Sequence, residues 1–249
     1  PDILPGRRKE MQFFTKGPEH VRANFDAYLR RFPEVDGSGQ AIIDWPELNS
    51  SGLLYEERLA FERAAGRSYV TGEASADTLC DGDPELLREF LPDLALVALL
   101  RDPVERAFSH HRMFGRFHDE GRELPFVPGE FATDMRDEMR RIASGDITPC
   151  LSPSLYLEHL VRWSEVWGDK LLVVFSAELN DPATHPECMS RILRHMGVPA
   201  HPYALEQRYN EAPAASIPAD IREELRAFFA PHDRALQAHL GSPLPWQIT

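Results

Sequence analysis

The chain has 249 residues, 43% of them hydrophobic, and a formal net charge of -13 at pH 7. A chain of this length can bury most of its apolar surface, and we expect one domain over residues 1–249. The strong negative charge argues against nonspecific binding to nucleic acid or to an anionic membrane, so neither is expected as a partner.

Targeting segments and cysteine pairs are both missing from the sequence. No apolar run reaches the length of a membrane span, and "PDILPGRRKE" lacks the features of a signal peptide, so we expect a cytoplasmic protein without a membrane span. Cys80, Cys150 and Cys188 are widely spaced and form no C-x-x-C pair. His111 and His118 are too far apart for a helical metal pair, so no metal is expected.

Short β-rich segments alternate with helical patterns along the chain, which is typical of a parallel α/β sheet. Buried strands are predicted at Arg67–Ser75, Leu94–Arg101 and Lys170–Leu179. Helices are predicted at His20–Arg31, Tyr55–Ala65, Pro84–Phe90, Val104–Phe117, Glu130–Ser144, Ser154–Trp167, His185–Met196 and Ala219–His239. We therefore expect an α/β fold.

The stretch "LALVALLRDPVERAFSHHRMF" joins a predicted strand to a predicted helix. Asp102 suits a helix N-cap, Pro103 suits the first helical position, and Glu105 adds an acidic start that resembles a capping box. Exposed amides at such a helix start favour anions. Arg101 lies where an anion would bind, and Ser109 follows roughly 10 Å along the helix. The alternative is that Arg101 pairs with a carboxylate and Ser109 only packs.

The same stretch, "LLRDPVERAFSHHRMF", resembles the signature with which PAPS-dependent sulfotransferases of the heparan-sulfate and bacterial type hold the 3′-phosphate of 3′-phosphoadenylyl sulfate (PAPS). This resemblance implies a P-loop-like three-layer α/β/α sandwich with a central parallel sheet. It also implies that PAPS is the sulfuryl donor and that Arg101 and Ser109 are the 3′-phosphate ligands.

Three further stretches resemble segments of that family in the same order. "RRKEMQFF" resembles the K-E-x-x-F-F segment and implies that Glu10 is the general base. "VTGEAS" resembles G-E-A-[ST]-P, and "SPSLYLEHLVRWSEVWGDKLLVVFSAEL" resembles a later helix and strand. For Glu10 the alternative is a solvated glutamate beside basic residues, and a base at His20 or His111 also remains open.

Three more residues are candidates for substrate binding, each with a structural alternative. Lys9 could lie near the sulfate or acceptor, or at a solvated loop end. Glu73 could orient the acceptor or a catalytic cation, or cap the next turn. Tyr156 could line the pocket, although with Leu160 and Trp163 it forms a helical stripe that is typical of a core.

The chain also departs from the family pattern. It contains no phosphate loop of the K-[AG]-G-T-[ST] kind. In relatives the P-D-[IV] segment that matches Pro1–Ile3 closes the helix after that loop, so we expect the first strand, loop and helix to lie immediately upstream, over roughly 25–30 residues. Ala76 replaces the usual proline, and "YNEAPAASIP" lacks the basic run of relatives.

The predicted function is transfer of a sulfuryl group from PAPS to a hydroxyl, or secondarily an amine, of a small-molecule, lipid or saccharide acceptor. The loops "HDEGRELPFVPGE" and "SGDITPCLSPS" are expected to border that acceptor. One alternative is a non-catalytic nucleotide-binding or scaffolding relative, which the missing loop favours. Another is a small-molecule kinase with Glu73 on magnesium, which would leave Arg101 and Ser109 without a role. No pattern indicates an oligomeric state.

Overall fold

The structure is a computed structural model that describes residues 2–5, 10–32, 34–35, 41–42, 69–124, 126–199 and 215–248. The chain divides into two compact units. Unit 1 consists of Pro1–Val97, Val166–Leu172 and Met189–Pro202, and unit 2 of Ala98–Glu165, Val173–Cys188 and Tyr203–Thr249. The single domain expected from chain length stays a prediction.

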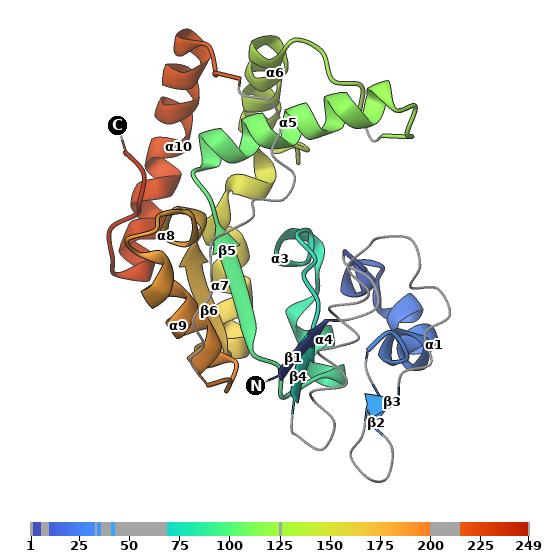
Figure 1. Cartoon of the computed structure of the whole chain (residues 1–249). Coiled ribbons are helices and arrows are strands. Elements are labelled where there is room, and N and C mark those ends of the chain that lie inside the picture. The colour runs from blue at the N-terminus through green and yellow to red at the C-terminus, as the bar shows by residue number, and fades with distance from the viewer. Residues whose placement is uncertain are drawn as a thin grey trace. The chain divides into compact units, whose positions relative to one another are not determined.

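Unit 1 contains a parallel strand pair. Strands β1 (Asp2–Pro5) and β4 (Tyr69–Gly72) lie side by side, with Ile3 opposite Val70 (Figure 1). Its first 97 residues also contain η1 (Phe13–Thr15), α1 (Pro18–Leu29), β2 (Glu34–Val35), β3 (Ala41–Ile42), α3 (Thr78–Asp81) and α4 (Pro84–Phe90). Strands β2 and β3 pair in the antiparallel sense.

An aromatic cluster fixes α1 against the turn η1. The ring of Tyr28 stacks on Phe13 at 4.3 Å between centroids and meets Phe14 edge to face at 5.5 Å. Such aromatic pairs add about 0.5–1.5 kcal/mol each beyond the area they bury. The cluster therefore holds the chain segment that follows Glu10.

A second strand pair consists of β5 (Leu96–Leu100) and β6 (Leu171–Phe175). Helix α5 (Pro103–Asp119) follows β5 directly. The remaining elements are α6 (Phe131–Ala143), η3 (Ser152–Ser154), α7 (Tyr156–Trp167), η4 (Gly168–Lys170), α8 (Ser176–Asn180), α9 (His185–His195) and α10 (Ala219–Leu240). None of the described helices is long and apolar enough to cross a membrane.

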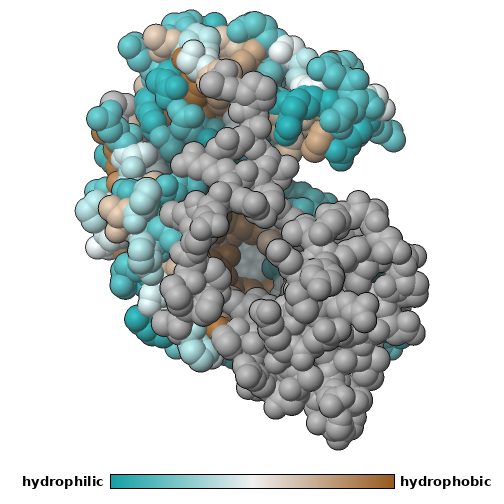
Figure 2. Space-filling view, viewed as in Figure 1, coloured by the Kyte–Doolittle hydropathy of each residue, from teal (hydrophilic) through white to brown (hydrophobic). Residues whose placement is uncertain are grey.

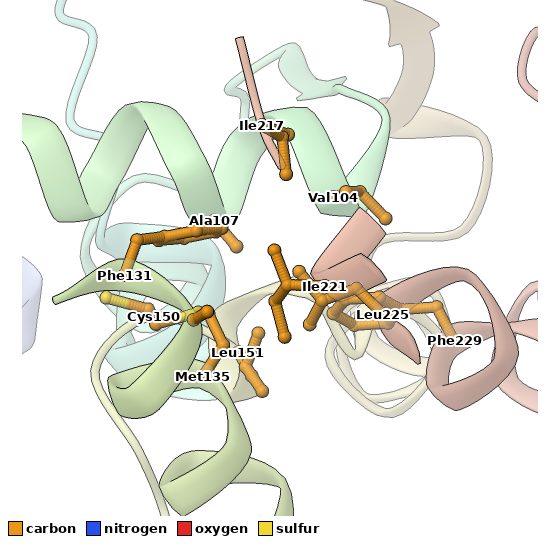
Figure 3. Packing of buried hydrophobic residues seen from close by; sticks show 11 residues of the cluster. Val104, Ala107, Phe131, Met135, Cys150, Leu151, Ile217, Ile221, Leu225 and Phe229 are labelled. Carbon is orange, nitrogen blue, oxygen red and sulfur yellow. The ribbon is translucent and has the colours of Figure 1, made fainter. Parts of the chain in front are cut away.

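The core of unit 2 lies between α5, α6 and α10 (Figure 3). Val104 of α5, Met135 of α6, and Ile221, Leu225 and Phe229 of α10 are fully buried in this cluster. Burial of each such side chain stabilises the fold by about 1.5–3 kcal/mol. The outward surfaces of α5 and α6 are mainly hydrophilic (Figure 2). Helix α5 is thus held by its buried face while its other face meets solvent.

The predicted helices match the described helices closely, and the strands match in part. Strands β4, β5 and β6 lie inside the predicted ranges but are shorter, and residues 67–68 and the helix predicted at Tyr55–Ala65 lie outside the described residues. The strand predicted to continue to Leu179 ends at Phe175, because the Glu178 carboxylate accepts the Phe175 amide at 3.1 Å and starts α8. Strands β1, β2 and β3 and the short helices α3 and α8 were not predicted, and the segment expected to close a helix at Pro1–Ile3 forms strand β1 from Asp2, because it pairs with β4.

Candidate active site

The junction between β5 and α5 has the predicted N-cap. The Asp102 carboxylate accepts the amides of Val104 at 3.0 Å and Glu105 at 3.4 Å, and Pro103 takes the first helical position. Glu105 does not complete a capping box, because its carboxylate binds Arg222 of α10 at 2.6 Å. The Asp102 carboxylate therefore already occupies the amides of Val104 and Glu105, and the anion site expected beside Arg101 stays a prediction.

Arg101 and Ser109 are both exposed in unit 2. Among the described residues, neither side chain has an ion-pair or hydrogen-bond partner, so the carboxylate that would pair with Arg101 is not found there. The Arg101 carbonyl accepts the hydroxyl of Tyr156 at 2.8 Å, and Tyr156 is buried. Tyr156 therefore fixes the backbone at Arg101, and Trp163 is buried as expected for a core residue.

Arg106 links α5 to the loop before α7, a role that its place in the motif did not reveal. Its guanidinium donates to the Cys150 carbonyl, to the Ser154 hydroxyl and, at 2.9 Å, to Nδ1 of His110. Burial, the Arg106 guanidinium and His111 lower the pKa of His110 to about 4. His110 is therefore neutral at pH 7, and because Nδ1 accepts from Arg106 its proton is assigned to Nε2.

A second arginine that sequence reasoning missed stabilises the same junction from α10. Arg226 contacts both carboxylate oxygens of Asp102, with Nη1 at 3.0 Å from Oδ1 and Nη2 on Oδ2. Asp233, about two turns further along α10, is buried and accepts the indole N–H of Trp246 at 2.9 Å. Burial raises the pKa of Asp233 to about 6, the charge of Asp102 adds to this rise, and the Trp246 hydrogen bond and Arg226 oppose it.

The pH dependence of stability should report the buried carboxyl of Asp233. Folded Asp233 binds its proton more tightly than the unfolded residue, so its stabilising contribution is present below about pH 4 and is lost as the pH rises through about 6. We expect Asp233→Asn to raise the free energy of unfolding at pH 8 by about 2 kcal/mol and to flatten its slope between pH 4 and 6. Urea unfolding at several pH values measures this. Glu223→Gln, an exposed position on α10, is the control, and an unchanged slope in Asp233→Asn would contradict the assignment.

Glu10 lies in unit 1 on a strained turn. Glu10 and Gln12 have positive φ angles of 56° and 47°, which costs about 1–2 kcal/mol for each non-glycine residue. The segment after β4 holds this turn: the Glu10 amide donates to Ala74 at 3.1 Å, Ala76 donates to the Glu10 carboxylate at 3.0 Å, and the Gln12 amide donates to Ser75 at 3.0 Å. The Glu10 side chain is exposed, so it can reach a ligand.

Glu73 directly follows β4 and precedes Ala74, whose carbonyl binds the Glu10 amide of this turn. Tyr28 donates its hydroxyl to Glu73 at 3.4 Å, while the other carboxylate oxygen is buried with no hydrogen-bond partner among the described residues. Burial raises the pKa of Glu73, the nearby charge of Glu10 adds to this, and the Met11 amide and the hydroxyls of Ser75 and Tyr28 oppose it. Burial and Glu73 also raise the pKa of Tyr28. Unit 1 thus presents one exposed and one partly buried carboxyl group.

The remaining candidates are placed as follows. Lys9 lies outside the described residues. His20 is half-buried beside Phe13. His111 is buried, and its Nε2 lies 2.8 Å from the Asp134 carboxylate, so this nitrogen is not free to take a proton from an acceptor. The described part of the chain holds no group of three or more side chains that could together bind a metal ion. The assigned roles of Lys9, Glu10, Glu73, Arg101, Ser109 and Tyr156 stay predictions.

Comparison with solved structures gives an informative similarity. No family model matches the chain, and no curated protein matches it. Among solved structures, the crystal structure of a sulfotransferase from Alicyclobacillus acidocaldarius aligns over 98% of this chain and 87% of that chain, with 24% sequence identity and a TM-score of 0.60. At this identity the similarity shows the fold, and the predicted class is confirmed: the chain has a sulfotransferase-like, P-loop-like α/β fold.

Proposed function

We propose that the protein is a PAPS-dependent sulfotransferase that acts on a hydroxyl, or secondarily an amine, of an organic acceptor. One observation carries the proposal: Arg101 and Ser109 are exposed and without partners among the described residues, while Tyr156 and Asp102 hold the backbone at Arg101 and at the start of the helix that carries Ser109. An arginine and a hydroxyl fixed in this way suit a phosphate dianion. The sulfotransferase-like fold supports the same reading.

The reaction needs few protein groups. The acceptor oxygen attacks the sulfur of PAPS, the bond between sulfur and the 5′-phosphate oxygen breaks, and 3′-phosphoadenosine 5′-phosphate (PAP) leaves. Glu10 accepts the proton of the acceptor hydroxyl, and Arg101 and Ser109 hold the 3′-phosphate. Such transfers depend mainly on positioning and on charge stabilisation, which these side chains supply.

The test compares two nucleotides and then measures transfer. Protein expressed from its complete coding sequence should bind PAP much more tightly than adenosine 5′-phosphate (AMP), which lacks the 3′-phosphate. It should also move label from ³⁵S-PAPS to an acceptor in a screen of sugars, lipids and acyl alcohols. Equal affinity for the two nucleotides would contradict the proposal.

A non-catalytic relative is the second candidate, and the absence of a K-[AG]-G-T-[ST] loop from these residues favours it. Such a protein would prefer PAP to AMP but transfer no label to any acceptor. A K-x-G-T-[ST] loop in the upstream coding sequence favours the enzyme. Its absence favours the binding protein.

A further inference from the structure

The start of α5 carries a negative charge that an anion-binding site must overcome. Asp102 follows Arg101 in the chain, and its carboxylate lies at the helix start, where it takes the amides of Val104 and Glu105. These amides would otherwise attract an anion, and the carboxylate itself repels one. The site proposed for the 3′-phosphate is therefore next to an acidic group.

Arg226 compensates this charge from a distant part of the sequence. It lies 124 residues after Asp102 on α10 and contacts both of its carboxylate oxygens. The exposed side-chain fractions are 17% for Arg226 and 18% for Asp102, so salt screens the pair only weakly. No other described cation forms an ion pair with Asp102.

Packing brings the two residues together. Val104, in the first turn of α5, and Leu225, the neighbour of Arg226, belong to the same buried cluster (Figure 3). Both residues are fully buried, so the guanidinium approaches Asp102 on a rigid helix. A pre-organised ion pair of this kind loses little entropy when a ligand binds nearby.

We propose that Arg226 is a positioning residue of the 3′-phosphate site, which it serves by neutralising the Asp102 carboxylate so that Arg101 and Ser109 face a ligand without local repulsion. This inference rests on the proposed function. It assigns to α10 a role in nucleotide selectivity through Asp102, with no contact between Arg226 and the ligand.

The experiment measures the ratio of the dissociation constants for AMP and PAP, which isolates the contribution of the 3′-phosphate. We expect Arg226→Met to lower this ratio about tenfold, because an uncompensated charge then lies next to the phosphate. Arg226→Lys keeps the charge but loses the two-oxygen contact, so its ratio should fall less. Arg136→Met is the matched control, since it breaks the ion pairs of α10 with α6 at Asp220 and Glu224, away from the start of α5, and should leave the ratio unchanged.

A double variant separates charge from structure. Asparagine is as good an N-cap as aspartate but carries no charge, so Asp102→Asn in the Arg226→Met background should restore most of the lost ratio. A merely structural role of Arg226 predicts no such rescue. Thermal melting of every variant identifies any that fails to fold. If Arg226→Met fails to fold, Arg226→Lys and the double variant decide.

The outcomes distinguish this inference from the proposed function. Wild-type protein that does not prefer PAP to AMP contradicts the proposed function. A wild type that prefers PAP, together with an unchanged ratio in the folded Arg226 variants, overturns the inference alone. A lowered ratio that Asp102→Asn fails to restore also overturns it.

Discussion

Replacing Glu10 with glutamine should lower the turnover of sulfuryl transfer by about 10²- to 10⁴-fold while the affinity for PAP stays nearly unchanged. Glutamine has the same size and can still accept the Ala76 amide through its carbonyl oxygen, so the strained turn is preserved. It cannot take the acceptor's proton. The loss should therefore appear in turnover and not in nucleotide binding.

Three comparisons make the Glu10 result specific. Glu19→Gln, an exposed position on α1 of the same unit, should behave as wild type. If a histidine is the base instead, Glu10→Gln stays largely active and His20→Ala or His111→Ala loses activity. Turnover and PAP affinity measured for all four variants decide the assignment, and near-normal turnover in Glu10→Gln excludes Glu10 as the base.

Replacing Arg101 with alanine should remove most of the preference for PAP over AMP. A hydrogen bond to a charged group contributes about 1.5–3 kcal/mol, so we expect PAP affinity to fall about 10- to 100-fold while AMP affinity changes little. The exposed guanidinium makes no ion pair among the described residues, so its loss should leave stability almost intact. Isothermal titration with both nucleotides measures the effect.

The control for Arg101 is Arg116, an exposed arginine on α5, the helix that follows Arg101. Arg116→Ala removes one positive charge from α5, further along the helix, and so tests a general charge effect. We expect its ratio of AMP to PAP affinity to match that of wild type. Ser109→Ala should show a smaller loss than Arg101→Ala, because a neutral hydroxyl contributes less than a guanidinium. Equal losses in Arg101→Ala and Arg116→Ala would indicate long-range attraction and no specific contact.

Local patterns were enough to predict most of the helices and the strand-to-helix junction. Asp102, Pro103 and Arg101 are neighbours in sequence, and N-capping depends only on residues within one turn. Strand β1 was missed because four residues that include a proline carry almost no strand pattern. Its pairing with β4 depends on a contact between segments more than 60 residues apart.

The supporting parts of the candidate site could not be predicted for a similar reason. Arg226 meets Asp102 only because α10 packs on α5, and one sequence gives no sign of which helices meet. The left-handed backbone conformation of Glu10 and Gln12 could not be predicted either, because non-glycine residues rarely adopt it and no glycine marks the turn. Resemblance indicated Glu10, but only the structure shows the strained backbone that presents it.

The N-cap of α5 has a consequence for how the protein can change over evolutionary time. A binding site built from backbone amides keeps its hydrogen-bond donors after nearly every substitution, because each residue except proline supplies the same N–H group. Here the Asp102 carboxylate binds two of those amides, so the proposed recognition of the 3′-phosphate depends on the side chains of Arg101 and Ser109. A single nucleotide exchange in either codon can therefore alter the preferred ligand while the scaffold stays intact. This junction is where close homologues should diverge first when their donor specificity differs.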